Sequence, residues 1–147
     1  DPALQKAGGE RAGDRVGGNW VYKNSNGMSS AYRGLHINTS RLRMQYSDFP
    51  MPEDYPDFPH HTHIAQYFDD YAEHFQLKRH IRFRTRVARA EPVPGGWEIT
   101  LEDGARRSYR ALIVANGHHW DPRWPEPPFP GEFRGRVLHS HEYLEPE

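Results

Sequence analysis

Between residues 62 and 75 the large apolar side chains recur at every third or fourth position, which is the spacing of one face of an α-helix. Acidic side chains occupy the opposite face, and Thr62, which follows a proline and two histidines, is suited to cap the first turn. The pattern predicts a helix over residues 62–75. The side chains through which it is expected to pack are Ile64, Phe68, Tyr71 and Phe75.

A second pattern, with a period of two, begins at Ile81. Residues 81–88 alternate between apolar or threonine positions and arginine or alanine, which is typical of a half-buried strand. Pro94-Gly95-Gly96 predicts a turn, residues 97–101 alternate again, and residues 102–104 predict another turn. Two or three antiparallel strands are therefore expected here.

Residues 109–115 form a nearly continuous apolar run, which is typical of a strand covered on both faces in a parallel sheet. Asn116-Gly117 ends the run, and closely spaced prolines follow, so the chain is expected to leave the sheet as an extended segment. Before the helix, residues 20–58 carry many aromatic residues with little periodicity, and loops of this kind in compact domains are usually functional. This order of elements is typical of the middle of an α/β nucleotide-binding domain.

The composition excludes or disfavours several classes of protein and of site. A net charge of −1 disfavours a nucleic-acid-binding protein, and no apolar run is long enough to cross a bilayer. The chain has no cysteine, which excludes disulfides and thiol catalysis, and no signal-peptide pattern, so a cytoplasmic protein is expected. The ten histidines do not follow a zinc-binding spacing, and no metal site is expected.

Two short segments are candidate binding elements, and each has a second interpretation. In Gly17-Gly18-Asn19-Trp20 the glycines permit a close backbone approach and the indole could face a ligand ring, or the segment is a turn before a core tryptophan. The amide of Asn38 could bind the polar edge of a heterocycle, or it satisfies the backbone of its own loop.

Four segments resemble the flavin-containing monooxygenases, over residues 14–143. They are the GG-x-W segment at Gly17–Trp20, the stretch from Asn38 to the Y-S-D-F-P run at 46–50, the strand end Ala115-Asn116-Gly117, and the F-x-G-x-x-x-H-x-x-x-Y element at 133–143. The last of these is the family fingerprint. Tyr143 stands where the Baeyer–Villiger branch has tryptophan, which favours the branch that oxygenates nitrogen and sulfur.

The resemblance implies an α/β fold, namely a partial, Rossmann-like FAD-binding domain of a two-dinucleotide flavoprotein with an antiparallel β-meander insertion. It also implies that residues 1–117 belong to the FAD-binding domain and that residues 118–147 form a proline-rich linker with the fingerprint, leading to an NADPH-binding domain. The chain contains neither of the two G-x-G-x-x-G motifs of such proteins. We interpret it as an internal fragment that is expected to be inactive alone.

The reaction implied by the resemblance uses NADPH and FAD to form a C4a-hydroperoxyflavin from O₂, which transfers one oxygen atom to a soft nucleophile in a small molecule. A homodimer is possible at full length. In this interpretation Asn38 is the catalytic residue. The implied cofactor-binding residues are Glu10, Gly17, Gly18, Asn19, Trp20, Asn38, Thr39, Val87, Ala115, Asn116 and Gly117, and the fingerprint residues are Phe133, Gly135, His139 and Tyr143.

Within this assignment Glu10 would bind the ribose, Val87 would end the first meander strand and use its backbone at the adenine, and Asn19 and Trp20 would border the flavin. His139 and Tyr143 would couple the two domains. Two alternatives remain open: a Baeyer–Villiger or N-hydroxylating relative, and a small non-catalytic α+β binding module.

Overall fold

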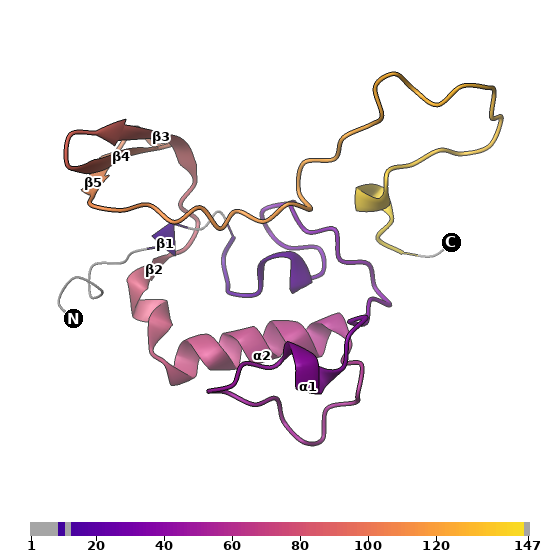
Figure 1. Cartoon of the computed structure of the whole chain (residues 1–147), viewed down its shortest axis with the longest axis horizontal. Helices are drawn as coiled ribbons and strands as arrows, with labels where there is room; N and C mark the ends of the chain where they lie inside the picture. The colour runs from indigo at the N-terminus through magenta and orange to yellow at the C-terminus, as the bar shows by residue number, and fades with distance from the viewer. Residues whose placement is uncertain (1–8, 11–12, 146–147) are drawn as a thin grey trace.

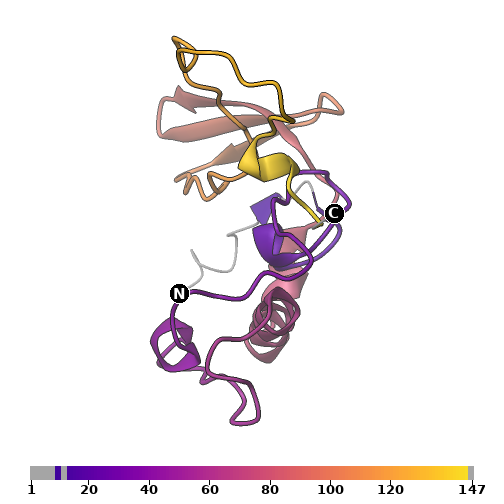
Figure 2. The same ribbon diagram turned by 90° about the vertical axis from the view of Figure 1, so that its right-hand side faces the viewer.

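The computed structural model describes residues 9–10 and 13–145. Its elements lie in two groups, one around a long helix and one in a three-stranded meander, and an extended segment follows the meander (Figures 1 and 2). In chain order the elements are β1 (Gly9–Glu10), η2 (Gly18–Trp20), α1 (Arg41–Met44), α2 (His61–His74), η3 (Leu77–His80), β2 (Ile81–Arg82), β3 (Val87–Val93), β4 (Gly96–Leu101), β5 (Arg106–Tyr109) and η4 (Ser140–Glu142).

The helix predicted over residues 62–75 is confirmed as α2, displaced by one residue at each end. Its cap is not Thr62, as the sequence predicted, but His60, whose side chain accepts the backbone N–H of Thr62. The Nδ1 atom of a neutral imidazole carries a lone pair, so it can satisfy one of the unpaired N–H groups of a first helical turn as a carboxylate or hydroxyl does.

The core lies between α2 and the aromatic loop before it. Ile37 and Met51 from the loop pack with Ile64 and Tyr67 from α2, and these four residues are buried. Tyr67 is the largest fully buried side chain, whereas Phe68 and Tyr71 are half-buried and Phe75 is 38% exposed. The predicted packing face is therefore rotated toward Tyr67. Burial of the loop's large apolar groups stabilises a stretch that has little regular structure of its own.

The predicted meander is also confirmed. Strand β4 pairs with β3 on one side and with β5 on the other, both antiparallel, and Trp97 lies opposite Pro92 and Tyr109. The turn between β3 and β4 contains Gly95 with φ +84°, and the turn after β4 contains Gly104 with the same value. Both conformations are in the left-handed region that glycine adopts without strain.

The single strand predicted over residues 81–88 is wrong. Ile81–Arg82 forms the short strand β2, parallel to β1, and the chain then turns at Arg84, which has φ +53°. Val87 consequently begins β3 and does not end a strand. The alternation in the sequence continues across the turn, so the pattern alone could not locate the break.

The buried strand predicted over residues 109–115 is wrong as well. Residues 111–117 have no regular structure, and Ile113 and Val114 are 90% and 73% exposed. An apolar run becomes a strand only where a neighbouring strand accepts its backbone hydrogen bonds. In the described part of the chain no strand pairs with these residues. The parallel pairing found there joins β1 to β2 and is two residues long.

Gly17 provides a direct test of the close packing within the η2 turn. Its φ is +114°, and a Cβ placed there would lie 2.8 Å from Cγ2 of Val21. Gly17→Ala is expected to lower the free energy of unfolding by about 1–3 kcal/mol from backbone strain, with a further loss from the clash. Denaturant unfolding measures this loss.

The matched control is Gly18→Ala. Gly18 also has a positive φ, of +52°, but no atom lies within 4 Å of a Cβ built there. Its substitution is expected to cost only about 1–2 kcal/mol, the cost of a left-handed conformation. Equal losses in the two variants would contradict the packing argument.

Candidate functional site

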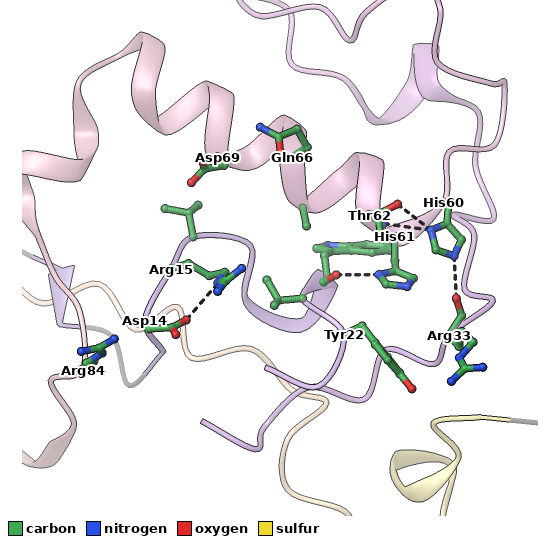
Figure 3. Close-up of a pocket in the computed structure, with 14 residues that line it drawn as sticks. Asp14, Arg15, Tyr22, Arg33, His60, His61, Thr62, Gln66, Asp69 and Arg84 are labelled. Atoms are coloured by element: carbon green, nitrogen blue, oxygen red, sulfur yellow. Dashed lines mark hydrogen bonds and ion pairs between the residues drawn. The ribbon is translucent and has the colours of Figure 1, made fainter. Parts of the chain in front are cut away.

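A cavity of about 810 Å³ lies between the segment that contains η2 and the first half of α2 (Figure 3). Residues 14–22 form one wall, and residues 60–69 form the opposite wall. Arg33 and Arg84 come from other parts of the chain. A volume of this size is within the range of small-molecule and cofactor sites, roughly 300–1,000 Å³.

The η2 turn brings Trp20 to this cavity. The N–H of Trp20 donates to the carbonyl of Gly17 at 2.9 Å, and the left-handed conformation of Gly17 allows the chain to close this tight turn. Trp20 contacts the core around Tyr67 and also lines the cavity. The two interpretations of this segment, a turn before a core tryptophan and a ring that faces a ligand, are therefore both consistent with its place.

Asn19, the third residue of this segment, is used for local structure. Its Oδ1 accepts the backbone N–H of Ser30 at 2.8 Å and the hydroxyl of Ser30 at 3.0 Å, while its carbonyl accepts the hydroxyl of Ser29 at 2.7 Å. These bonds hold residues 29–30 against the turn. The side chain of Asn19 therefore positions the loop beside the cavity and does not line the cavity itself.

Two histidines at the start of α2 form one edge of the cavity. His61 is 3% exposed, and its Nδ1 donates to the carbonyl of Trp20 at 3.2 Å, because a carbonyl can only accept. Burial lowers the pKa of His61, so it is neutral at pH 7. His60 donates from Nε2 to the carbonyl of Arg33 at 2.7 Å. The two imidazoles thus connect α2 to the loops that form the opposite wall.

The charged groups at the cavity are three guanidinium groups and two carboxylates. Arg15, Arg33 and Arg84 line it together with the carboxylates of Asp14 and Asp69. The hydrogen bond from Arg15 to Asp14, at 3.2 Å, lowers the pKa of that carboxyl group. The guanidinium groups can donate several hydrogen bonds each to phosphate or carboxylate oxygens.

Asn38 and Thr39 lie outside this cavity lining, and both are exposed. The side chain of Asn38 forms no hydrogen bond with the residues that the structure describes, so it does not satisfy the backbone of its own loop there. Its neighbour Ile37 is buried and its N–H donates to the carbonyl of Pro59 at 3.0 Å, which fixes the backbone position of Asn38.

The other predicted cofactor residues are separate from the cavity. Val87 and residues 115–117 are exposed and do not line it, and Glu10 is the second residue of the strand β1. Only Gly17–Trp20, among the predicted cofactor elements, contributes to the cavity, through Trp20.

The fingerprint residues lie in an extended, mostly exposed segment and form local contacts. A Cβ on Gly135 would overlap the ring of Phe133, so this exposed ring would have to move to admit a side chain there. His139 caps η4: its Nδ1 accepts the N–H of His141 at 3.1 Å, and Glu142 accepts the N–H of His139 at 3.0 Å. Spacing alone did not indicate these roles.

The last fingerprint residue, Tyr143, packs on Tyr32 with ring centroids 5.7 Å apart. Two residues later, Glu145 contacts Tyr22, Lys23 and Arg33. Glu145 and its three partners were not predicted as site residues, because no spacing in the sequence relates segments that lie so far apart in the chain.

In the described ranges, no three histidine or acidic side chains are grouped so that they could hold a metal ion. The described helices include none that combines the length and the apolar character needed to cross a bilayer.

Comparison with known proteins gives consistent matches. A sequence model of the family described as flavin-binding monooxygenase-like matches residues 1–147. Flavin-containing monooxygenase 5 of Rattus norvegicus is 36% identical over 145 residues, which cover 90% of this chain and 27% of that protein. The chain therefore spans about a quarter of the length of this curated relative.

Solved structures agree with the sequence matches. The S-allyl-L-cysteine S-oxygenase of Allium sativum is 26% identical with a TM-score of 0.78, over 92% of this chain and 36% of that one. A steroid monooxygenase bound to NADP is 28% identical with a TM-score of 0.60, over 74% of this chain and 20% of that one. The α/β flavoprotein fold predicted from the sequence is confirmed, although the strand at 109–115 is not formed.

Proposed function

Since this chain belongs to the flavin-binding monooxygenase-like family, we propose that it forms part of an FAD- and NADPH-dependent enzyme that transfers one oxygen atom from O₂ to the nitrogen or sulfur of a small nucleophile. The observation that carries the proposal is the cavity beside η2, where an indole and several guanidinium groups face one space. FAD, when bound, would supply the redox chemistry and the reaction with O₂.

The residues of the cavity fit part of a flavin nucleotide. Trp20 offers an aromatic face against which a planar ring can pack, and such contacts contribute about 0.5–1.5 kcal/mol beyond the buried area. Arg15 and Arg33 offer charged N–H donors that suit phosphate oxygens. The chain's own groups would thus bind and orient the nucleotide and exclude water from it.

We further propose the division of the chain into a partial FAD-binding domain, residues 1–117, and a linker, residues 118–147, that leads toward an NADPH-binding domain. The extended course of residues 111–139 and the return of residues 143–145 to the cavity wall support this division (Figure 1). Tyr143 at the last fingerprint position, and the relative named as an S-oxygenase, support oxygenation of nitrogen or sulfur over Baeyer–Villiger chemistry.

The test is a titration of FAD with the chain, in which binding is measured by the quenching of flavin fluorescence. Binding is expected to be weak and reversible, because the sequence has no G-x-G-x-x-G turn to hold the pyrophosphate. Trp20→Leu keeps the apolar bulk but removes the aromatic face, and it is expected to raise the Kd for FAD about two- to tenfold.

Trp97→Leu is the matched control, because Trp97 lies in β4 and does not line the cavity. It is expected to leave the Kd for FAD unchanged. The proposal is overturned if the unsubstituted chain does not quench flavin fluorescence at any concentration tested, or if the two tryptophan variants behave alike.

A further inference from the structure

Glu145 joins the end of the fingerprint segment to the wall of the cavity. Its Oε1 accepts a hydrogen bond from Lys23 Nζ at 2.6 Å and another from the hydroxyl of Tyr22, and its Oε2 lies 3.1 Å from Nη2 of Arg33. We call Tyr22, Lys23, Arg33 and Glu145 the Glu145 clamp. Tyr22 and Arg33 also line the cavity, as Figure 3 shows.

The two residues before Glu145 contact the same wall. The carbonyl of Leu144 accepts the backbone N–H of Arg33 at 2.8 Å, and the ring of Tyr143 packs on that of Tyr32. Three consecutive residues therefore hold residues 22–33 through a ring contact, a backbone hydrogen bond and a charged cluster. Cooperation of this kind gives a defined position that a single exposed ion pair would not.

The backbone at Lys23 supports a specific role for the clamp. Lys23 has φ +47°, in the left-handed region that a long side chain rarely adopts. Such a conformation persists where the surroundings hold it. The ammonium group of Lys23 reaches Glu145, and the neighbouring Tyr22 reaches both Glu145 and the cavity.

We propose that Glu145 is a positioning residue for the cavity: by holding Tyr22 and Arg33 it couples the fingerprint segment to the ligand bound there. The ligand class, a flavin nucleotide, rests on the proposed function. With one edge of its guanidinium held by Glu145, Arg33 keeps other N–H donors for a phosphate or another anionic group. Without Glu145, Arg33 loses its carboxylate partner at the cavity wall.

The carboxylate of Glu145 is ionised over the whole useful pH range. Hydrogen bonds from Lys23 and then Tyr22, together with the charge of Arg33, lower the pKa of Glu145 from 4.5 to about 2. Because the folded-state pKa is depressed, the stabilisation by this group is present above pH 4.5 and is lost as the pH falls toward 2. Binding experiments between pH 6 and 8 therefore compare the charged carboxylate of Glu145 with the uncharged amide of Glu145→Gln.

The experiment measures FAD binding to the chain and to Glu145→Gln by quenching of flavin fluorescence. Glu145→Gln is expected to raise the Kd for FAD about tenfold, and Glu145→Asp is expected to restore part of the affinity. Glu132→Gln is the matched control: Glu132 is exposed, lies in the same segment, and has no ion pair with the described residues. It is expected to bind FAD as the unsubstituted chain does.

A double-mutant cycle separates positioning from general stability. Arg33→Gln is expected to raise the Kd for FAD. The double variant with Glu145→Gln is expected to bind FAD more tightly than the sum of the two single losses predicts, because part of the effect of Glu145 passes through Arg33. Additive losses overturn the proposal. So does an unchanged Kd in Glu145→Gln.

Failure of the unsubstituted chain to bind FAD would overturn the proposed function, and the clamp is then judged by amide hydrogen exchange at Arg33. The N–H of Arg33 donates to Leu144. Its exchange is expected to become at least tenfold faster in Glu145→Gln and to stay unchanged in Glu132→Gln. Equal exchange rates in the unsubstituted chain and in Glu145→Gln would overturn the clamp.

Discussion

Tyr67→Ala is expected to lower the free energy of unfolding by about 3–5 kcal/mol, a large part of the stability of a small domain. Tyr67 is 1% exposed and packs on Tyr46, Phe49 and Phe68. Its loss leaves a cavity where α2 meets the aromatic loop. Circular dichroism during denaturant unfolding measures the change.

The hydroxyl of Tyr67 adds a second, separable effect. It donates to the carbonyl of Phe49 at 2.5 Å and accepts the N–H of Tyr46 at 2.8 Å. Tyr67→Phe keeps the ring but leaves both backbone groups without this partner, at an expected cost of about 1–3 kcal/mol.

Tyr71→Phe is the matched control on the same helix. The hydroxyl of Tyr71 forms no hydrogen bond with the described residues, and its ring is half-buried. This substitution is expected to change stability by less than about 0.5 kcal/mol. If Tyr67→Phe were as stable as Tyr71→Phe, the hydrogen bonds of Tyr67 would not hold the loop as argued.

The parts of the fold that the sequence predicts well are those with local patterns. The period of α2 and the alternation in β4 each reflect neighbours on one face, and turn residues such as Gly95 and Gly104 mark the ends of strands. The apolar run at 109–115 was misjudged, because a strand requires a partner edge that its own sequence does not encode. The cap is His60 and not the predicted Thr62, because it depends on a side-chain hydrogen bond that the sequence pattern does not reveal.

The candidate site shows the same division. The Gly17–Trp20 segment could be predicted to approach a ligand, because paired glycines before an aromatic residue carry a local signal, and Trp20 does line the cavity. The Glu145 clamp could not, since Tyr22 and Glu145 are 123 positions apart and their contact depends on the course of the whole chain. The partner of a single exposed charged residue such as Lys23 cannot be predicted from the neighbouring sequence.

Asn38 remains a prediction, and the structure offers one argument for it. The alternative interpretation, in which its amide satisfies its own loop, finds no such hydrogen bond among the described residues, while Ile37 beside it is buried and anchored to Pro59. A polar side chain on a fixed backbone, with its donors and acceptor uncommitted, is suited to bind a ligand group.

In the whole enzyme, Asn38→Ala is expected to lower the rate of product formation about 10²–10³-fold, equivalent to about 2.7–4 kcal/mol, because one hydrogen-bond donor is lost where charge develops. FAD binding and NADPH oxidation are expected to continue, with the electrons diverted to H₂O₂. The ratio of product to NADPH consumed, measured together with H₂O₂, reports this directly.

Asn26→Ala is the control that distinguishes a role of Asn38 at the flavin from a general loosening of the loops. Asn26 accepts the N–H of Met28 at 2.9 Å, so its substitution removes a local hydrogen bond from a surface turn by the same change of side chain. If general loosening of the loops caused the loss of product, Asn26→Ala would share it. A role at the flavin requires that Asn38→Ala alone uncouples NADPH oxidation from oxygenation, and an unchanged yield of product per NADPH in Asn38→Ala would exclude that role.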